Sequence, residues 1–193
     1  MTTNKAGAPA FALFETPIGV CGIVWRGETV AATALPDAVP GRTRTRLLAR
    51  HPGAVESEPS PAIAALIAAI RDLLRGAAAD FSSAALDFAG VSDFDRGVYQ
   101  AALAIPLGRT VTYGEMAKSI GDPGAARAVG AALGRNPFPI IVPCHRILAS
   151  GGKSGGFSAP GGTATKFRIL QIERAGTGSD GGLFGHLPLA VKP

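Results

Sequence analysis

The sequence has 193 residues, 47% of them hydrophobic, enough to bury the core of one large or two small domains. Its longest apolar run, residues 62–70, is far too short to cross a membrane, and the first residues lack the layout of a signal peptide. The net charge of +5 lies in the second half, because residues 1–91 hold eight basic and eight acidic residues and residues 92–193 hold eleven and six. That half suits a polyanion, although so small an excess does not establish nucleic-acid binding.

Cysteine usage argues against disulfides and against a metal centre. Two cysteines occur, Cys21 and Cys144, so we expect no disulfide framework and a reducing, cytoplasmic location. A structural zinc site needs about four Cys or His ligands. The two cysteines and the widely separated histidines, His51, His145 and His186, do not predict one.

The first half has the pattern of a small α/β unit. Turn signals separate three short strands of an antiparallel meander, expected at residues 11–14, 20–25 and 29–35. A basic helix is expected at residues 42–50, and we interpret its arginines as a solvated face. Ser60 is placed to cap a helix that continues to Arg75 and ends at Gly76. Cys21 lies in a strand pattern and is expected to be a core residue.

The second half is predicted to be helical. Ser92 opens a helix that ends before Pro106, and Thr112 with Glu115 has the spacing of a capping box that starts a further, short helix. Asp122-Pro123 is expected to supply the cap and first-turn proline of the helix containing residues 125–133. These last two helices, joined by a glycine-rich turn, make a helix-turn-helix.

The second helix of this pair is unusually slim. Nearly all its outward positions are Ala or Gly, and Arg127 is its one charge before Arg135. A helix that reads base edges in the major groove would carry several Asn, Gln, Arg or Lys side chains. The pattern leaves two interpretations open: a helix that approaches the minor groove without reading sequence, or a core helix that needs small residues for packing.

Cys144 and His145 stand side by side in a segment too apolar for an ordinary surface loop. A thiol is a useful nucleophile only as the thiolate, and a neighbouring imidazole is a common means of forming one. Taken alone, the pair fits a structural cysteine beside a solvated histidine, or a Cys-His hydrolase, as well as any other reactive site.

Four linked motifs resemble those of the O6-alkylguanine-DNA alkyltransferases, also called methylated-DNA–protein-cysteine methyltransferases. They are Val-Thr-Tyr-Gly-Glu at 111–115, Ala-Ala-Arg-Ala-Val-Gly at 125–130, Arg-Asn-Pro-Phe-Pro-Ile at 135–140 and Pro-Cys-His-Arg at 143–146. The resemblance covers about residues 94 to 173 in family order, and in the first half it is mostly architectural. It implies an α+β fold with three parts: a small α/β domain with an antiparallel sheet at 1–91, a helical, winged-helix-like domain with the helix-turn-helix at 92–175, and a flexible tail at 176–193.

The resemblance implies a DNA repair protein that takes alkyl groups from O6 of guanine and, less well, from O4 of thymine. Cys144 would accept the alkyl group in one displacement and keep it as a thioether, so each molecule would act once. This chemistry needs no metal or organic cofactor. The implied partner is double-stranded DNA bound through its minor groove with little sequence specificity, and we expect a monomer with no membrane association.

Roles for single residues also follow from the resemblance. His145 would be the base, acting through a bound water, Glu173 would orient it, Tyr113 would donate to guanine N3, and Asn136 would hold the turn before Cys144. The remaining expected contacts to DNA or to the flipped base are Arg127, Ala126, Gly130, Arg135, Phe157 and Ser158. Arg127 would fill the space that the flipped nucleotide leaves.

One departure and two alternatives bear on this reading. Phe157 stands where many relatives have a tyrosine, and Ala159-Pro160 precedes the glycine pair, so the size of alkyl group accepted is open. A non-repairing, alkyltransferase-like lesion-binding protein would lack the reactive cysteine, whereas Cys144 is present. A Cys-His hydrolase would leave the helix-turn-helix and Arg127 unexplained.

Overall fold

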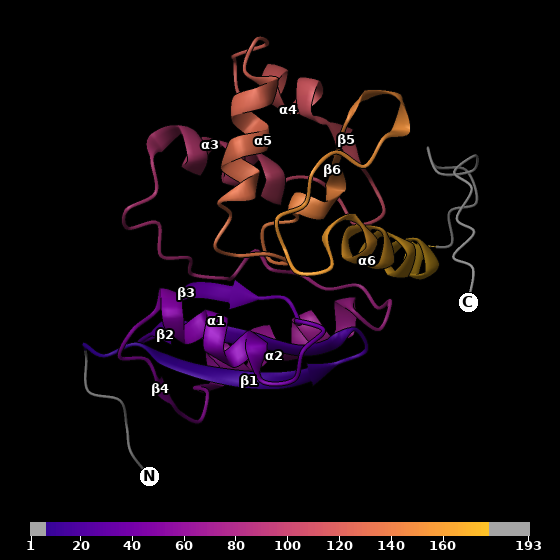
Figure 1. The fold of residues 1–193 in the computed structure, drawn as a ribbon. Helices are drawn as coiled ribbons and strands as arrows, with labels where there is room; N and C mark the ends of the chain where they lie inside the picture. The colour runs from indigo at the N-terminus through magenta and orange to yellow at the C-terminus, as the bar shows by residue number, and fades with distance from the viewer. Residues whose placement is uncertain (1–6, 178–193) are drawn as a thin grey trace.

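The computed structural model describes residues 7–177 and arranges them as a sheet layer below a helical half (Figure 1). The sheet has the order β3-β2-β1-β4, and its strands are β1 (Ala10–Thr16), β2 (Gly19–Arg26), β3 (Thr29–Ala34) and β4 (Val55–Glu56). β1 and β3 pair antiparallel with β2, and the short β4 adds parallel to β1. The predicted three-stranded meander is confirmed, and β4 is an addition.

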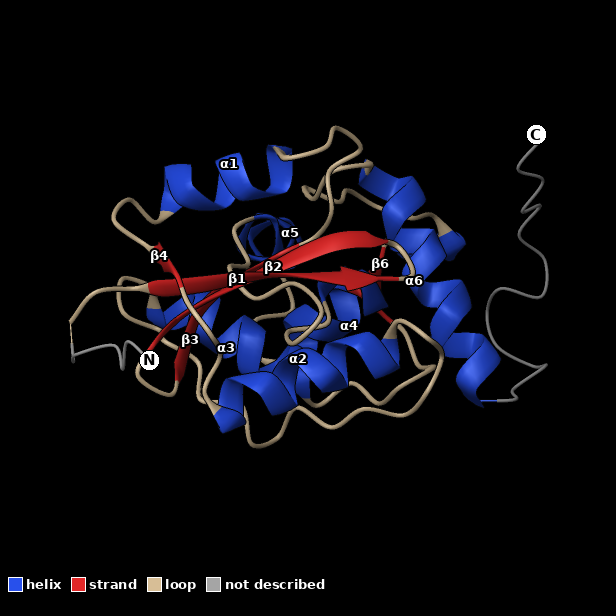
Figure 2. Ribbon diagram, turned by 90° about the horizontal axis from the view of Figure 1, so that it is seen from below, coloured by secondary structure: helices blue, strands red, loops and turns tan. Residues whose placement is uncertain are grey.

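Helices cover both faces of this sheet, which is why β2 is buried almost along its whole length. Figure 2 shows α1 (Arg42–Arg50) on one face and α2 (Pro61–Leu73) on the other. On the α1 side Phe11, Val24 and Leu47 form a small cluster. The other face carries Ile23 and Trp25 into the main core.

The predicted helices of the first half are confirmed, with one changed boundary. α1 has the expected bounds, and the Ser60 hydroxyl accepts the N–H of Ile63 at the start of α2. α2 ends at Leu73, two residues before the expected Arg75. Gly76 then adopts φ 89°, the left-handed conformation that favours glycine and ends the helix.

The helical half contains α3 (Asp93–Leu103), α4 (Tyr113–Ser119), α5 (Ala126–Gly134) and α6 (Gly162–Thr177). Short 3-10 turns, η1 (Cys144–Arg146) and η2 (Ser150–Gly152), lie between α5 and α6, and β5 (Val111–Thr112) pairs in parallel with β6 (Ile147–Leu148). Thr112 and Glu115 form the predicted capping box. α6 continues two residues into the expected tail, and residues 178–193 of that tail lie outside the described residues.

The predicted start of α5 is wrong. Asp122 and Pro123 belong to a turn in which the Ala125 N–H donates to the Asp122 carbonyl. The first helical bond runs from Val129 N–H to the Ala125 carbonyl, so Ala125 occupies the cap position without a side-chain bond. Pro123 therefore stands three residues before the helix rather than in its first turn.

The two halves share one core and are joined beside the cysteine segment. The main buried cluster contains side chains from the sheet, α2, α3, α5 and α6. The edge strand β3 bonds to the segment that leads to Cys144: Thr33 N–H donates to the Pro137 carbonyl at 2.8 Å and the Thr33 hydroxyl to the Pro139 carbonyl at 2.7 Å. The sheet thus supports the backbone of the candidate site. Within residues 7–177 no helix has the length and apolar character needed to cross a bilayer.

Candidate active site

Cys144 is the first residue of η1, directly after Pro143, and its side chain is buried. The segment before it is bent sharply, because Ile140 has φ 79°, a conformation that a β-branched residue rarely adopts. Ile140 is buried, so the surrounding core holds this strained backbone in place. A strained, immobilised turn fixes the position of the thiol.

Asn136 joins the end of α5 to this turn. Its side-chain N–H₂ donates to the Val142 carbonyl at 3.0 Å, and its oxygen accepts the Phe138 N–H at 2.9 Å. The Asn136 side chain also acts to lower the pKa of the Cys144 thiol. The residue expected to hold the turn thus influences the thiol as well.

His145, Glu173 and Arg146 form a buried polar cluster behind Cys144. His145 Nε2 lies 2.8 Å from Glu173 Oε1, and Arg146 binds the same carboxylate through Nε at 3.0 Å and Nη2 at 2.8 Å. Arg146 Nη1 also donates to the Ile105 carbonyl at 2.7 Å. η1 and α6 thereby place two neighbouring residues of the sequence on one carboxylate.

The charges of this cluster follow from its contacts. Burial opposes a charged Glu173, but the hydrogen bonds and charges of His145 and Arg146 outweigh it and lower its pKa to about 2. Burial lowers the pKa of His145, despite the opposing effect of Glu173. His145 is therefore neutral, and we assign its proton to Nε2 because the partner of that atom is an acceptor.

The second ring nitrogen of His145 is left as a base. Among the buried side-chain N and O atoms of the described residues, His145 Nδ1 is the one without a protein partner. With the proton on Nε2, Nδ1 carries a lone pair. An oriented neutral imidazole with a free lone pair can accept a proton from a thiol, directly or through a water.

Burial raises the pKa of the Cys144 thiol above its usual value. The Asn136 hydrogen bond, the charge of Lys166 and the backbone N–H groups of Cys144 and His145 act in the opposite direction. The resting group is a thiol. Forming the thiolate therefore requires a base and nearby positive charge, and His145 and Lys166 are placed to supply them.

Lys166 is a fully buried cation on α6. Its Nζ donates to the Ile147 carbonyl at 2.6 Å and the Ser154 carbonyl at 2.8 Å, and it lies 5.8 Å from the centre of the Tyr113 ring. Burial lowers its pKa to about 8. Lys166 thus joins the segment after Cys144 to the loop that precedes α6.

A cavity of about 620 Å³ opens in front of Cys144, within the range of small-ligand sites. Its lining includes seven of the expected site residues: Tyr113, Ala126, Arg127, Gly130, Cys144, Phe157 and Ser158. The Tyr113 hydroxyl is 3.4 Å from the Gly156 carbonyl, so Tyr113 and the loop face each other across the cavity.

Gly155 allows this close approach. It has φ +65°, and a Cβ on it would lie 2.6 Å from Cε2 of Tyr113. Both the backbone conformation and the space therefore require glycine. The loop from Ser154 to Ser158 can lie against Tyr113 because no side chain intervenes.

Four expected residues lie outside the cavity lining. Asn136 and the His145–Glu173 pair support Cys144 from behind, as described above. Arg135, expected at the DNA, caps the C-terminal end of α5 and makes a bidentate ion pair with Asp95 at 2.8 and 2.9 Å. Arg127 is exposed and makes no hydrogen bond or ion pair with any described residue.

Sequence reasoning overlooked Arg146 and Lys166 as site residues. The available signals were a charge within the apolar segment around Cys144 and, for Lys166, its position on the apolar face of α6. Lys166 shares the spacing of the buried residues Ile169, Leu170 and Glu173. In the part of the chain that the structure describes, no cluster of three or more His, Cys, Asp or Glu side chains could hold a metal ion.

Comparisons with known proteins agree on one family. Residues 93–175 match the family model described as "6-O-methylguanine DNA methyltransferase, DNA binding domain". The methylated-DNA–protein-cysteine methyltransferase of Methanothermobacter thermautotrophicus is 36% identical over 157 residues, which are 81% of each chain. The protein of the same name from Mycobacterium tuberculosis is 48% identical over 99 residues, 51% of this chain and 58% of that protein.

Solved structures extend the similarity to the whole fold. The structure of Mycobacterium tuberculosis OGT in complex with DNA superimposes with a TM-score of 0.70 at 30% identity, covering 86% of this chain and 93% of that one. An O6-methylguanine-DNA methyltransferase from Pyrococcus kodakaraensis superimposes with a TM-score of 0.64 at 26% identity, covering 86% and 98%. The first half therefore shares the family architecture despite its weak sequence pattern.

Proposed function

The chain belongs to the family of O6-methylguanine-DNA methyltransferases, and we propose from this membership that it repairs O6-alkylguanine in double-stranded DNA by transferring the alkyl group to Cys144. The observation that supports the proposal most strongly is the position of Cys144. Its thiol lines the cavity, and the neutral imidazole of His145 with its anionic partner Glu173 lies behind it. O4-alkylthymine would be a poorer substrate.

The proposed reaction is a single displacement. His145 Nδ1 takes the thiol proton, through a water, and the thiolate sulfur attacks the alkyl carbon. The S–C bond forms as the C–O6 bond breaks, and the electron pair moves into the guanine ring. The leaving guanine anion takes a proton from the solvent, and His145 later returns the thiol proton to the solvent. Glu173 stabilises the resulting imidazolium, and Tyr113 donates to guanine N3 as negative charge develops. The thioether is stable, so each molecule acts once.

The proposed substrate must leave the DNA duplex, because O6 lies within the base stack. α5 would approach the minor groove, and the exposed Arg127 at the mouth of the cavity would occupy the space of the flipped nucleotide. Small side chains on this helix, including Ala126 and Gly130, permit close approach without reading the sequence. The proposal also places the protein in the compartment that holds the DNA, so a cytoplasmic location stays our prediction, as does the monomeric state.

A duplex carrying O6-methylguanine with a labelled methyl group tests the proposal. Wild-type protein in excess is expected to remove all label, and protein in deficit is expected to remove one label per molecule. Cys144→Ala is expected to bind the duplex and remove none. Repeated turnover would indicate a hydrolase, and binding of the lesion by the wild type without transfer would indicate a lesion-binding protein; either result would contradict the proposal.

A further inference from the structure

A second cavity reaches Cys144 from the side of the sheet. It has a volume of about 740 Å³ and lies between α1, the residues after α5 and the loop before α6. We call it the α1 groove. It shares Gly134, Cys144 and Ser158 with the cavity in front of the cysteine, so the two meet at the reactive thiol.

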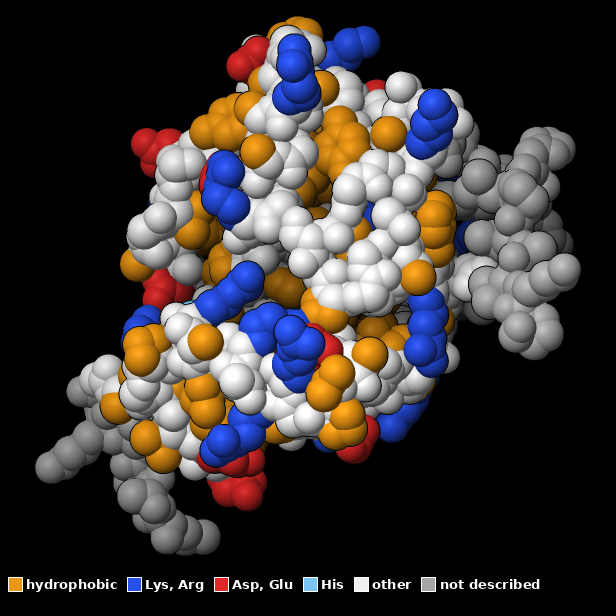
Figure 3. All heavy atoms as spheres, in the orientation of Figure 1, with side chains coloured by type: hydrophobic (Ala, Val, Ile, Leu, Met, Phe, Trp, Pro, Cys, Tyr) orange, Lys and Arg blue, Asp and Glu red, His pale blue; other side chains and the backbone are white. Residues whose placement is uncertain are grey.

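The α1 groove is strongly basic. Arg42, Arg46 and Arg50, each four residues apart and so on one side of α1, line it together with Arg135 from the other half of the molecule. Asp37 is the one acidic residue among its described lining residues. Figure 3 shows Lys and Arg side chains gathered beside a hollow where the two halves meet. Arg42, Arg44 and Arg50 are exposed, as expected of a solvated face, and Arg42, Arg46 and Arg50 also line this groove.

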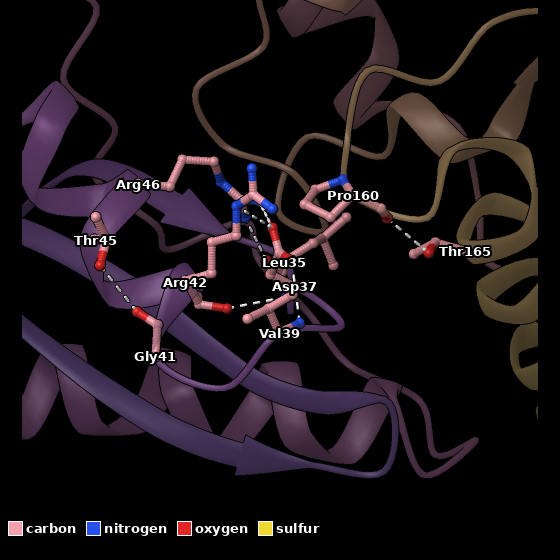
Figure 4. Close-up of polar contacts among 10 residues, drawn as sticks. Leu35, Asp37, Val39, Gly41, Arg42, Thr45, Arg46, Pro160 and Thr165 are labelled. Carbon is pink, nitrogen blue, oxygen red and sulfur yellow. Dashed lines mark hydrogen bonds and ion pairs between the residues drawn. The ribbon is translucent and has the colours of Figure 1, made fainter.

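Asp37 compensates only part of this charge. Its carboxylate lies 3.1 Å from Arg46 and 4.0 Å from Arg42, and Arg46 also donates to the Leu35 carbonyl at 2.6 Å (Figure 4). Arg50 is exposed and makes no ion pair with a described residue. Burial and the neighbouring Arg50 and Arg42 lower the pKa of Arg46, while Asp37 opposes them. An anion in the groove would relieve this repulsion.

Arg44 belongs to the same helix but not to the groove. It lies over the Phe11 ring at 5.4 Å and is 3.7 Å from Glu56, both on the sheet side. Its charge is therefore directed elsewhere. Of the four α1 arginines, three line the α1 groove and Arg44 does not, so Arg44 is a matched control for them.

We propose that the α1 groove binds backbone phosphates of the DNA strand whose nucleotide is flipped toward Cys144, so that the first half of the chain takes part in DNA binding. The inference rests on the proposed function. A strand that delivers a base to the cavity in front of Cys144 must pass its rim, and the groove continues from that rim at Ser158 and Gly134. Arg135 is already paired with Asp95, but Asp37 compensates only part of the charge of Arg42, Arg46 and Arg50, and the negative charge of phosphodiesters would compensate the rest.

Duplex affinity measured against salt concentration tests the inference. All variants are made in a Cys144→Ala background so that binding reaches equilibrium without transfer. Each lost phosphate contact is expected to reduce the slope of log K against log salt by about 0.9. The double variant Arg42→Gln/Arg50→Gln loses two such contacts, so its slope should fall by about twice that amount. The slope of Arg44→Gln should be unchanged. Asp37→Asn should tighten binding, because it frees Arg42 and Arg46.

Three results would overturn the inference. An unchanged slope in the Arg42/Arg50 double variant, confirmed as folded by its thermal unfolding, would exclude phosphate contacts at the groove. If Arg44→Gln reduced the slope as much as the Arg42/Arg50 double variant does, the change would reflect the net charge of the protein and not contacts in the groove. A variant that loses cooperative binding at an unchanged slope would assign the groove to a second copy of the chain. These binding measurements use proteins that lack Cys144, whereas label transfer is measured with Cys144 present. Failure of this inference can therefore be distinguished from failure of the proposed function.

Discussion

Arg146 forms a buried, bidentate ion pair with Glu173, with Nε 3.0 Å from Oε2 and Nη2 2.8 Å from Oε1. Because an arginine side chain is always charged, this pair stabilises the ionised form of Glu173 even while His145 is neutral. His145 can then remain neutral at rest and find a counter-charge already in place when it accepts a proton. One carboxylate thus serves both the fold and the proposed chemistry.

Glu173→Gln is expected to lower both stability and transfer. Removing one partner leaves the Arg146 guanidinium buried without compensation, which costs about 3 kcal/mol or more in the free energy of unfolding. Denaturant unfolding measures the first effect and single-turnover transfer the second. Glu58→Gln, an exposed site, is the control. An unchanged free energy of unfolding in Glu173→Gln would contradict the ion pair.

The pH dependence of stability should report the same pair. The pKa of Glu173 is about 2 in the folded protein and 4.5 without the fold, so its contribution is present above pH 4.5 and is lost as the pH falls through about 2. The wild type should therefore lose more unfolding free energy than Glu173→Gln across that window. Parallel curves for the two proteins would show that the carboxylate has no special partner.

Lys166→Met is expected to slow transfer by raising the pKa of the Cys144 thiol. The variant removes the positive charge that lowers the pKa of Cys144 and the bonds to the Ile147 and Ser154 carbonyls. The rate of reaction with free O6-benzylguanine, measured against pH, should show the rise that follows thiolate formation moved to higher pH. The exposed Lys153→Met should keep the wild-type profile. A slower reaction whose pH profile is not shifted would show that Lys166 has only a structural role.

Gly155→Ala should disturb the cavity more than its backbone conformation alone explains. A methyl group there would meet Tyr113 at 2.6 Å, whereas a Cβ on Gly151, at a similar φ of +69°, meets nothing within 4 Å. Both substitutions carry the left-handed penalty of about 1 kcal/mol. Transfer to free O6-benzylguanine should fall strongly in Gly155→Ala and little in Gly151→Ala. Equal rates would show that the Tyr113 contact is unimportant.

Much of the fold follows from local sequence patterns, and the elements that those patterns do not predict have local causes as well. The bounds of α1, the cap of α2 at Ser60 and the capping box at Thr112 are encoded in neighbouring residues. β4 is two exposed residues long and has no pattern to detect. The start of α5 was misplaced because an Asp-Pro pair opens a turn as readily as a helix, and here Gly124 separates the pair from the first helical turn.

The candidate site depends on contacts that local patterns do not contain. His145 and Glu173 are 28 residues apart, and their pairing was expected from the family resemblance alone. Arg146 binds Glu173 at a similar separation, and Lys166 reaches the carbonyl of Ile147, 19 residues away. Such contacts arise when α6 packs on η1, which is a property of the tertiary structure.

Arg127→Ala should separate base flipping from the chemical step. The side chain is free of described partners and stands at the mouth of the cavity, so its loss should not affect the fold. Transfer from duplex DNA is expected to slow much more than transfer from free O6-benzylguanine. Arg75→Ala, at an exposed site in the turn after α2, controls for loss of charge. Equal losses on both substrates would argue against a role in extrusion.

The most direct test compares the two cysteines of the protein after reaction with O6-methylguanine in duplex DNA. Cys21 is buried, burial raises its pKa to about 11, and its hydrogen-bond partner is the Thr16 hydroxyl, whereas Cys144 lines the cavity with His145 behind it. Intact-mass and peptide analysis should find one methyl group per molecule, all of it on the peptide containing Cys144, in the wild type and in Cys21→Ala alike. Methyl groups on Cys21, more than one per molecule, or none on an active protein would contradict transfer to Cys144.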